Sequence, residues 1–255
     1  MRMFTPVLMK LKRSTALSPR DELALQQVLG RYKVIPARQD VVWDGDRPAH
    51  ATVLLDGLMC RYTAMPDGRR QILSFLLPGD FCDLSALMED RMDHAVATLA
   101  TCTVAAVEHH ALEHVIDTHP SIRHALWRET LRDAAIYRAS LASIGRRSAY
   151  ERLAHLFCEI AVRLDLVGMK RTEGYVFEAT QNDIGDALGL SVVHVNRMLQ
   201  QLRDDQLFTF RGSTFAIHDW GRLTEIAGFD PAYLHLDGHS SIPGIAPAAT
   251  SWDVD

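Results

Sequence analysis

The sequence predicts an α+β protein with an N-terminal antiparallel β-roll or jelly roll, one long helix, and a C-terminal winged helix-turn-helix domain. Three observations support this fold class. Short strand-like runs alternate with glycine-containing turns up to about residue 108, an uninterrupted helical stretch follows Pro120, and two short helices with a hairpin occupy residues 180–217.

Composition and charge set the broad class of the protein. The 255 residues are 47% hydrophobic and 23% charged, which is typical of a soluble globular chain long enough for two domains. No apolar run approaches the roughly 20 residues that cross a bilayer, and the start lacks the apolar core of a secretory signal. We therefore expect a cytoplasmic protein without a membrane partner. The net charge of −5 argues neither for nor against DNA binding, because attraction to phosphates depends on the charge of the binding surface and not on the total charge.

The N-terminal half reads as a capped helix followed by short strands. Ser18 and Pro19 open the helix, and Gly30 ends it. Turn signals such as Asp56-Gly57 separate the strand-like runs, and their close spacing predicts a small antiparallel barrel. The runs are 34–35, 40–43, 52–55, 58–62, 71–76, 94–99 and 102–107.

A short helical connector, 108–119, leads into a long helix over residues 121–147. An apolar seam on this helix has steps of four, four, three, four and three, which is coiled-coil spacing. We predict that the seam is a dimer contact; the alternative is that the helix lies across its own barrel. The seam residues are Leu126, Thr130, Ala134, Tyr137, Leu141 and Ile144.

Residues 180–203 are typical of a helix-turn-helix. Thr180 and Asp183 form a predicted capping box, Gly185 leaves room for a close helix crossing, and Gly189 suits the turn. A second helix over 191–203 has its apolar stripe at Val195, Met198, Leu199 and Leu202. A helical hairpin without DNA-binding function is the alternative interpretation.

The outer face of the second helix carries side chains that contact base edges or phosphates in DNA-binding proteins. The pattern therefore predicts a helix that enters the major groove. A predicted hairpin over 207–217 supplies the wing, and 220–227 adds a last helix. The expected DNA-binding residues are Thr180, Gln181, Ser191, Val192, Val193, His194, Asn196 and Arg197.

From about residue 15 to 217 the chain resembles the Crp/Fnr family of bacterial transcription regulators. The resemblance rests on Leu55-Asp56-Gly57, on the run from Asp67 to Phe81 with its Pro-Gly-Asp turn, and on the spaced Gly185, Gly189 and Val195. It implies a sensor domain over 1–119, a dimerisation helix over 120–147 and a DNA-binding domain over 148–230. The Gly/Pro/Ser/Ala-rich composition of the end of the chain predicts a flexible tail within 231–255. It also implies a homodimer that binds an inverted-repeat operator in promoter DNA and acts on RNA polymerase.

The signal-binding positions depart from the cyclic-nucleotide-binding members. No arginine stands beside His94 where those members hold a phosphate, and Asp93 would repel one, so cAMP and cGMP are disfavoured. Arg91 is the alternative phosphate ligand. By the resemblance, the effector pocket comprises Arg69, Gly79, Asp80, Phe81, Cys82, Asp83, Asp93 and His94.

The cysteines and histidines give no clear cofactor site. The first cysteine is Cys60 and no CxxC spacing occurs, which disfavours an iron–sulfur cluster of the oxygen-sensing type and any structural metal site. The histidines around the connector leave haem binding as an alternative, although surface or capping roles are the simpler interpretation. Cys82 is either a redox thiol or, more simply, a buried one. We expect no cofactor.

DNA readout departs from the family as well. Val193 stands where many members have a glutamate, whereas Arg197 matches the family's recognition arginine and is the best candidate for guanine. Two other classes remain as alternatives: a ligand-sensing module that acts on a protein partner, and a cupin-like enzyme. The barrel stretch contains only His50 and His94 and no HxH pair, so we expect no enzyme and no catalytic residues.

Overall fold

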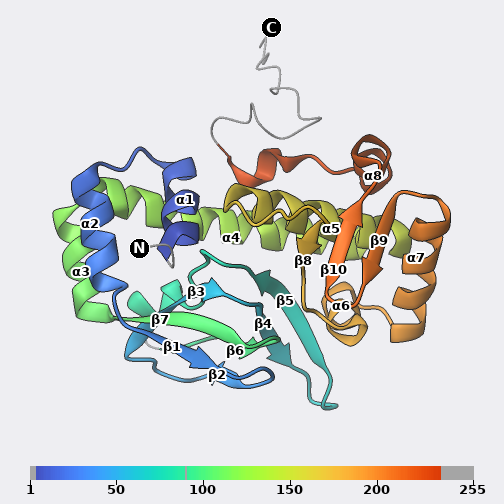
Figure 1. The fold of residues 1–255 in the computed structure, drawn as a ribbon. Coiled ribbons are helices and arrows are strands. Elements are labelled where there is room, and N and C mark those ends of the chain that lie inside the picture. Colours follow the sequence, from blue (N-terminus) through green and yellow to red (C-terminus); the bar gives the residue numbers. More distant parts are fainter. Residues whose placement is uncertain (1–3, 90, 237–255) are drawn as a thin grey trace, which may run out of the picture.

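The computed structural model describes residues 4–89 and 91–236. The N-terminal domain is a β-roll of two antiparallel sheets, with strand orders β1-β7-β3 and β2-β6-β4-β5 (Figure 1). The predicted strands are confirmed. They are β1 Tyr32–Ile35, β2 Asp40–Val42, β3 His50–Asp56, β4 Met59–Ala64, β5 Arg70–Leu76, β6 Ala95–Thr98 and β7 Cys102–Glu108.

Two apolar clusters build this domain. One fills the space between the sheets with Leu54 and Val104 from the first sheet and Met59, Leu76 and Val96 from the second. The other lies on the outer face of the first sheet, where α1 Thr5–Ser14, α2 Pro19–Val28, α3 His109–Thr118 and the start of α4 Pro120–Arg146 cover it. A short 3₁₀ helix, η2 Leu84–Leu87, follows the Pro-Gly-Asp turn.

The helix α1 was absent from the sequence prediction; its side chains Val7, Leu8 and Leu11 pack in the core of the β-roll, and Lys10 enters a buried charge network. Lys10 Nζ lies 2.6 Å from Asp80 Oδ1 and also contacts Glu129 of α4. Arg163 Nη2 contacts the other carboxylate oxygen of Asp80 at 2.7 Å. Burial alone would raise the pKa of Asp80, but Lys10 and Arg163 outweigh it and hold that pKa below its usual range. A buried charge network therefore joins α1, the β-roll, α4 and the C-terminal domain.

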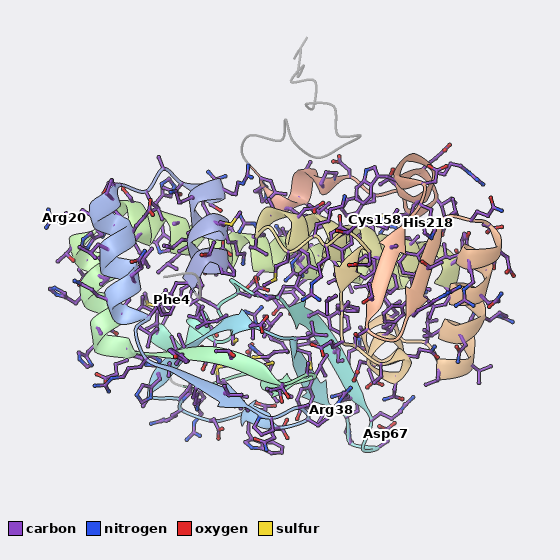
Figure 2. The ribbon with its side chains drawn as sticks, viewed as in Figure 1. Phe4, Arg20, Arg38, Asp67, Cys158 and His218 are labelled. Carbon is purple, nitrogen blue, oxygen red and sulfur yellow. The ribbon has the colours of Figure 1, made fainter. Side chains whose placement is uncertain are left out.

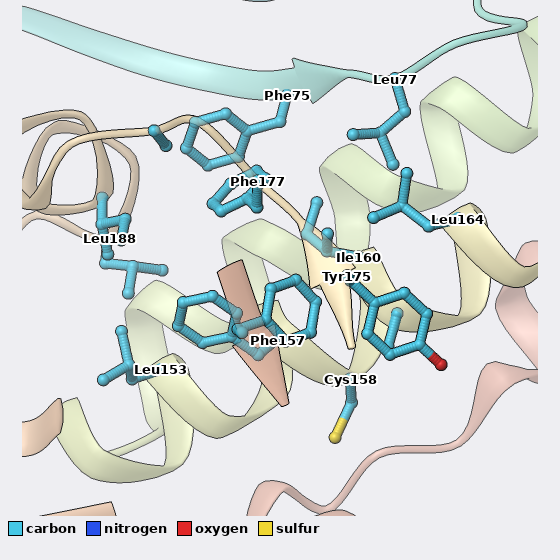
Figure 3. Close-up of a cluster of buried hydrophobic side chains, with 14 of the residues drawn as sticks. Phe75, Leu77, Leu153, Phe157, Cys158, Ile160, Leu164, Tyr175, Phe177 and Leu188 are labelled. Carbon is cyan, nitrogen blue, oxygen red and sulfur yellow. The ribbon is translucent and has the colours of Figure 1, made fainter. Parts of the chain in front are cut away.

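The C-terminal domain is a winged helix. Its elements are α5 Ala149–Leu166, β8 Tyr175–Val176, α6 Gln181–Leu188, α7 Val192–Asp204, β9 Phe208–Arg211, β10 Thr214–Ile217 and α8 Trp220–Ala227. The three strands pair in the order β8-β10-β9. Its core includes β5 residues of the β-roll: Phe75 meets Phe177 edge to face at 5.0 Å between ring centroids (Figure 3).

The predicted tail over 231–255 is wrong for residues 231–236, and residues 237–255 lie outside the described part of the chain. A short 3₁₀ helix, η3 Pro231–Leu234, follows Asp230, whose side chain accepts from the amide of Ala232. Leu234 and Leu236 are buried in the main core, and Tyr233 donates to Glu159 of α5 at 2.7 Å. Apolar burial of Leu234 and Leu236 and this hydrogen bond order the segment, whereas the Gly/Pro/Ser/Ala-rich composition that predicted a tail begins only at about residue 237.

Candidate nucleic-acid interface and sensor cavity

The helix-turn-helix forms as its local chemistry predicts. Thr180 accepts from the amide of Asp183 at 3.2 Å, and the Asp183 carboxylate accepts from the amide of Thr180 at 2.7 Å. Gly189 ends α6 in the left-handed conformation with φ of 66°. Ser191 accepts from the amide of His194 at 3.3 Å and so caps α7.

The two faces of α7 separate as expected. The predicted stripe from Val195 to Leu202 is buried, whereas the opposite face is open to solvent. Val193 is 79% exposed, and Asn196 and Arg197 are also exposed. Arg197 Nη2 lies 2.8 Å from His194 Nε2, so these two side chains form a polar pair on the open face. Thr180 and Ser191 are exposed, Val192 is 39% exposed, and Gln181 is half-buried.

A cavity of about 640 Å³ lies between the second sheet of the β-roll and α4. Three of the eight predicted pocket residues line it: Cys82, Asp93 and His94. Its remaining wall is largely apolar, with polar groups from Arg61, Gln71 and Asp133. The other lining residues are Ile72, Leu73, Leu84, Ser85, Thr130, Ala134, Tyr137, Ser140, Leu141, Ile144 and Ala187.

The remaining five predicted pocket residues are placed elsewhere. Arg69 lies at an exposed hairpin tip and pairs with Asp67 at 2.6 Å. Gly79 packs against the backbone of Pro6, and Asp80 belongs to the buried charge network. The other two are also buried: Phe81 contributes to the core under α1 and α2, and Asp83 accepts from the amide of Thr52 at 2.6 Å.

Arg61, which the sequence did not single out, is the buried cation of the cavity. Each of its three nitrogens is engaged. Nε donates to the carbonyl of Cys82 at 3.0 Å, Nη1 to the hydroxyl of Tyr137 at 3.1 Å, and Nη2 to the carbonyl of Phe81 at 2.7 Å. Nη2 also lies 2.9 Å from Oδ2 of Asp133 on α4. An anionic ligand would have to displace these internal partners.

Asp93 acts more weakly than the sequence suggested. Its side chain is 90% exposed and lies 2.6 Å from Nδ1 of His94, so solvent screens its repulsion of an anion. Arg91 donates to the carbonyl of Gly45 at 3.0 Å on the surface and does not line the cavity.

The cysteines are buried thiols, as the simpler interpretation held. Burial raises the pKa of Cys82 well above its usual value and that of Cys60 to about 12, so neither forms a thiolate near neutral pH. Cys102 and Cys158 are buried too. Among the described residues, no group of three or more His, Cys, Asp or Glu side chains is arranged to hold a metal ion.

The predicted dimer seam on α4 is wrong at Leu126. That side chain is 3% exposed and packs in the chain's own core with α1, α2 and α3. Tyr137 turns toward Arg61 and is half-buried. The apolar side chains that α4 leaves open are Trp127 at 62%, Leu131 at 61% and Leu141 at 73%. Leu141 and Thr130, which belong to the predicted seam, are thus exposed, and Trp127 and Leu131 are further exposed apolar side chains on the same helix.

Comparisons with known proteins agree with this architecture. Residues 151–226 match the Crp-like helix-turn-helix domain, and residues 32–119 match the cyclic nucleotide-binding domain. The transcriptional activator protein FnrL of Cereibacter sphaeroides is 27% identical over 214 residues, which cover 82% of this chain and 86% of that protein. The chain belongs to the Crp/Fnr family of transcription regulators.

Other family members support the same assignment. The nitrogen fixation regulation protein FixK of Bradyrhizobium diazoefficiens is 28% identical over 182 residues, covering 71% of this chain and 75% of that protein. The solved structure of FixK2 from Bradyrhizobium japonicum superposes with a TM-score of 0.71 at 23% identity, covering 78% of this chain and 98% of that one. The chain is thus a DNA-binding transcription regulator with a cyclic-nucleotide-binding-like domain. No helix in the described residues is long and apolar enough to cross a membrane.

Proposed function

We propose that the chain binds an inverted-repeat operator in promoter DNA as a homodimer and acts on RNA polymerase in the cytoplasm. The observation that carries the proposal is the division of α7 into a buried stripe and an open polar face with Arg197 and His194 at its centre. A two-fold dimer would present two such faces about one DNA turn apart. Thr180, Gln181 and Ser191, at the starts of α6 and α7, are proposed to meet phosphates.

The β-roll is proposed to sense a signal other than a cyclic nucleotide, or none. Arg61 of the β-roll already binds Asp133 and Tyr137 of α4. These side chains therefore connect the β-roll to α4 without a bound anion. We propose no cofactor and no catalytic role.

The test is selection of duplexes from a randomised library by the purified chain, followed by binding measurements on the enriched sequence. We expect an inverted repeat and binding that weakens steeply with salt. Arg197→Ala should lower affinity for that repeat by about 1–3 kcal/mol and leave binding to scrambled DNA unchanged. Arg20→Ala is the matched charge control, because Arg20 lies on α2 at the end of the molecule away from His218 and the winged helix (Figure 2). Absence of any enriched, salt-sensitive sequence would favour a module that acts on a protein partner.

A further inference from the structure

Two arginines of the β-roll hold the first helix of the helix-turn-helix. Arg38 donates to both carboxylate oxygens of Asp183, from Nη1 at 2.8 Å and from Nη2 at 2.9 Å. Arg70 contacts Asp183 as well and donates from Nε to Asp186 at 2.8 Å. Such bidentate contacts fix orientation as well as distance. We call these four side chains the interdomain latch.

Asp183 links the latch to the fold of α6. It is fully buried and closes the capping box with Thr180, so one carboxylate serves both the helix start and the domain contact. Burial alone would raise its pKa, but hydrogen bonds from Arg38 and Thr180 outweigh that effect, and the pKa lies below its usual value. The carboxylate is therefore charged at neutral pH and depends on its partners, because an unpaired buried charge is costly.

Arg38 reaches Asp183 from a strained backbone. Its φ is 63°, in the left-handed region that a residue with a Cβ rarely adopts. The amide of Arg38 donates to the carbonyl of Thr98 at 3.0 Å, which holds the loop in this conformation. Strain at a non-glycine residue persists where the surroundings impose it, and such sites concentrate at functional positions.

The neighbouring contacts of β5 act on the same helix. Gln71 donates from Nε2 to the carbonyl of Ala187 on α6 at 3.1 Å, and both residues line the cavity. Further along β5, Phe75 packs against Phe177, which lies just before α6 in the chain. One strand of the β-roll thus supplies an ionic, a polar and an apolar contact to the winged helix, and two of the contacting residues border the cavity.

We propose that Arg38 and Arg70 are positioning residues for DNA binding. They hold α6 against the β-roll, and α7, which packs on α6 through the turn at Gly189, is thereby held with its outer face open. This inference rests on the proposed function, since it assigns a role in operator binding to residues outside the winged helix. Neither arginine needs to touch DNA for this role.

The experiment compares Arg38→Gln and Arg70→Gln with Arg69→Gln on the duplex that the wild-type chain selects. Arg69 is the matched control, because it is the neighbour of Arg70 but pairs with Asp67 at the hairpin tip. We expect each latch variant to bind at least ten-fold more weakly, while Arg69→Gln stays within two-fold of wild type. Equal or tighter binding by both latch variants would overturn the proposal.

A distance measurement separates positioning from loss of folding. Spin labels at Lys33→Cys on β1 and Gln200→Cys on α7 report how the two domains sit, since both sites are exposed and the native cysteines are buried. Labelled chains are mixed with an excess of unlabelled chain, so that a dimer carries labels on one copy only and the distance is measured within one chain. We expect one narrow distance distribution in the wild-type background and a broadened one in Arg38→Gln/Arg70→Gln, with helical content unchanged. An unchanged narrow distribution would overturn the proposal. If the wild-type chain enriches no duplex, the proposed function fails first and this inference falls with it.

Discussion

Arg61 of β4 and Asp133 of α4 form an ion pair in which Nη2 and Oδ2 are 2.9 Å apart. The guanidinium is nearly fully buried, whereas the Asp133 side chain is 29% exposed at the cavity wall. The register of β4 against β5 shifts between Arg61 and Tyr62, and a shift of this kind re-aims a side chain. The pair thus ties the β-roll to α4 at the wall of the cavity.

Replacing Asp133 with Ala should destabilise the protein by about 1–3 kcal/mol, because the buried guanidinium loses one charged hydrogen-bond partner. Urea denaturation measures the loss. Asp67→Ala is the control: Asp67 pairs with Arg69 at an exposed site, where solvent screens the pair, so its loss should leave stability nearly unchanged. If the two variants were equally stable, the Arg61 pair would not hold the β-roll to α4.

Asp83 should make stability fall between about pH 4 and pH 6. Burial raises its pKa to about 6, and hydrogen bonds from Thr52 and the charge of Arg61 only partly oppose the shift. Because the folded pKa lies above the unfolded value, the folded state binds more protons in this window, and stability declines as pH rises through it. The total loss is roughly 2–3 kcal/mol above pH 6.

Asp83→Asn tests this sign directly. The amide oxygen can still accept from the amide of Thr52, while the side chain no longer ionises. Chemical denaturation from pH 4 to pH 7 gives the free energy of unfolding of both proteins, and in their difference the contributions of shared groups such as Asp80 cancel. We expect the stability of the variant to rise relative to that of the wild type as pH rises. Parallel curves would show that Asp83 does not titrate in this range.

The sequence was sufficient where structure depends on near neighbours. The Thr180–Asp183 capping box, the Gly189 turn and the apolar stripe of α7 each depend on contacts within a few residues, and all three occur. A repeating apolar pattern on α4, by contrast, predicts that one face of the helix is buried but does not show which part of the protein buries it. For Leu126 the cover is α1, α2 and α3, which come from distant parts of the chain.

The positions of charged residues in the β-roll could not be inferred from their types. Arg69 and Arg70 are adjacent, yet one lies at an exposed tip and the other reaches α6, because the hairpin bend and strand alternation send neighbours to different surroundings. The position of the Arg61 side chain likewise depends on a register shift, and that of Arg38 on a backbone of positive φ. No local sequence pattern predicts either feature. Of the eight residues of the predicted effector pocket, only Cys82, Asp93 and His94 therefore line the cavity.

Gly185→Ala should destabilise the winged helix by about 1–3 kcal/mol. A Cβ there would lie 2.5 Å from the carbonyl oxygen of Leu190, so the two helices of the motif would have to move apart. This cost exceeds the roughly 1 kcal/mol by which alanine favours a helix over glycine. Gly221→Ala in α8 is the control, since its nearest contact would be an ordinary 3.7 Å to Asp219. Thermal unfolding measures the stability of both variants. Equal stability of Gly185→Ala and Gly221→Ala would contradict the close crossing of the two helices.

Leu131→Asp should dissociate the proposed dimer while the chain stays folded. Leu131 is 61% exposed on α4, one helical turn from Trp127, and burial of this face against a second copy would leave the introduced carboxylate desolvated. Sedimentation equilibrium should show at least a ten-fold rise in the dimer dissociation constant with an unchanged helical spectrum. Leu23→Asp, at a site 56% exposed on α2, should leave the dimer intact. Leu126→Asp should instead unfold the β-roll, because that side chain is already buried within one chain. A Leu131→Asp variant that remains dimeric at the wild-type concentration would place the interface on another surface.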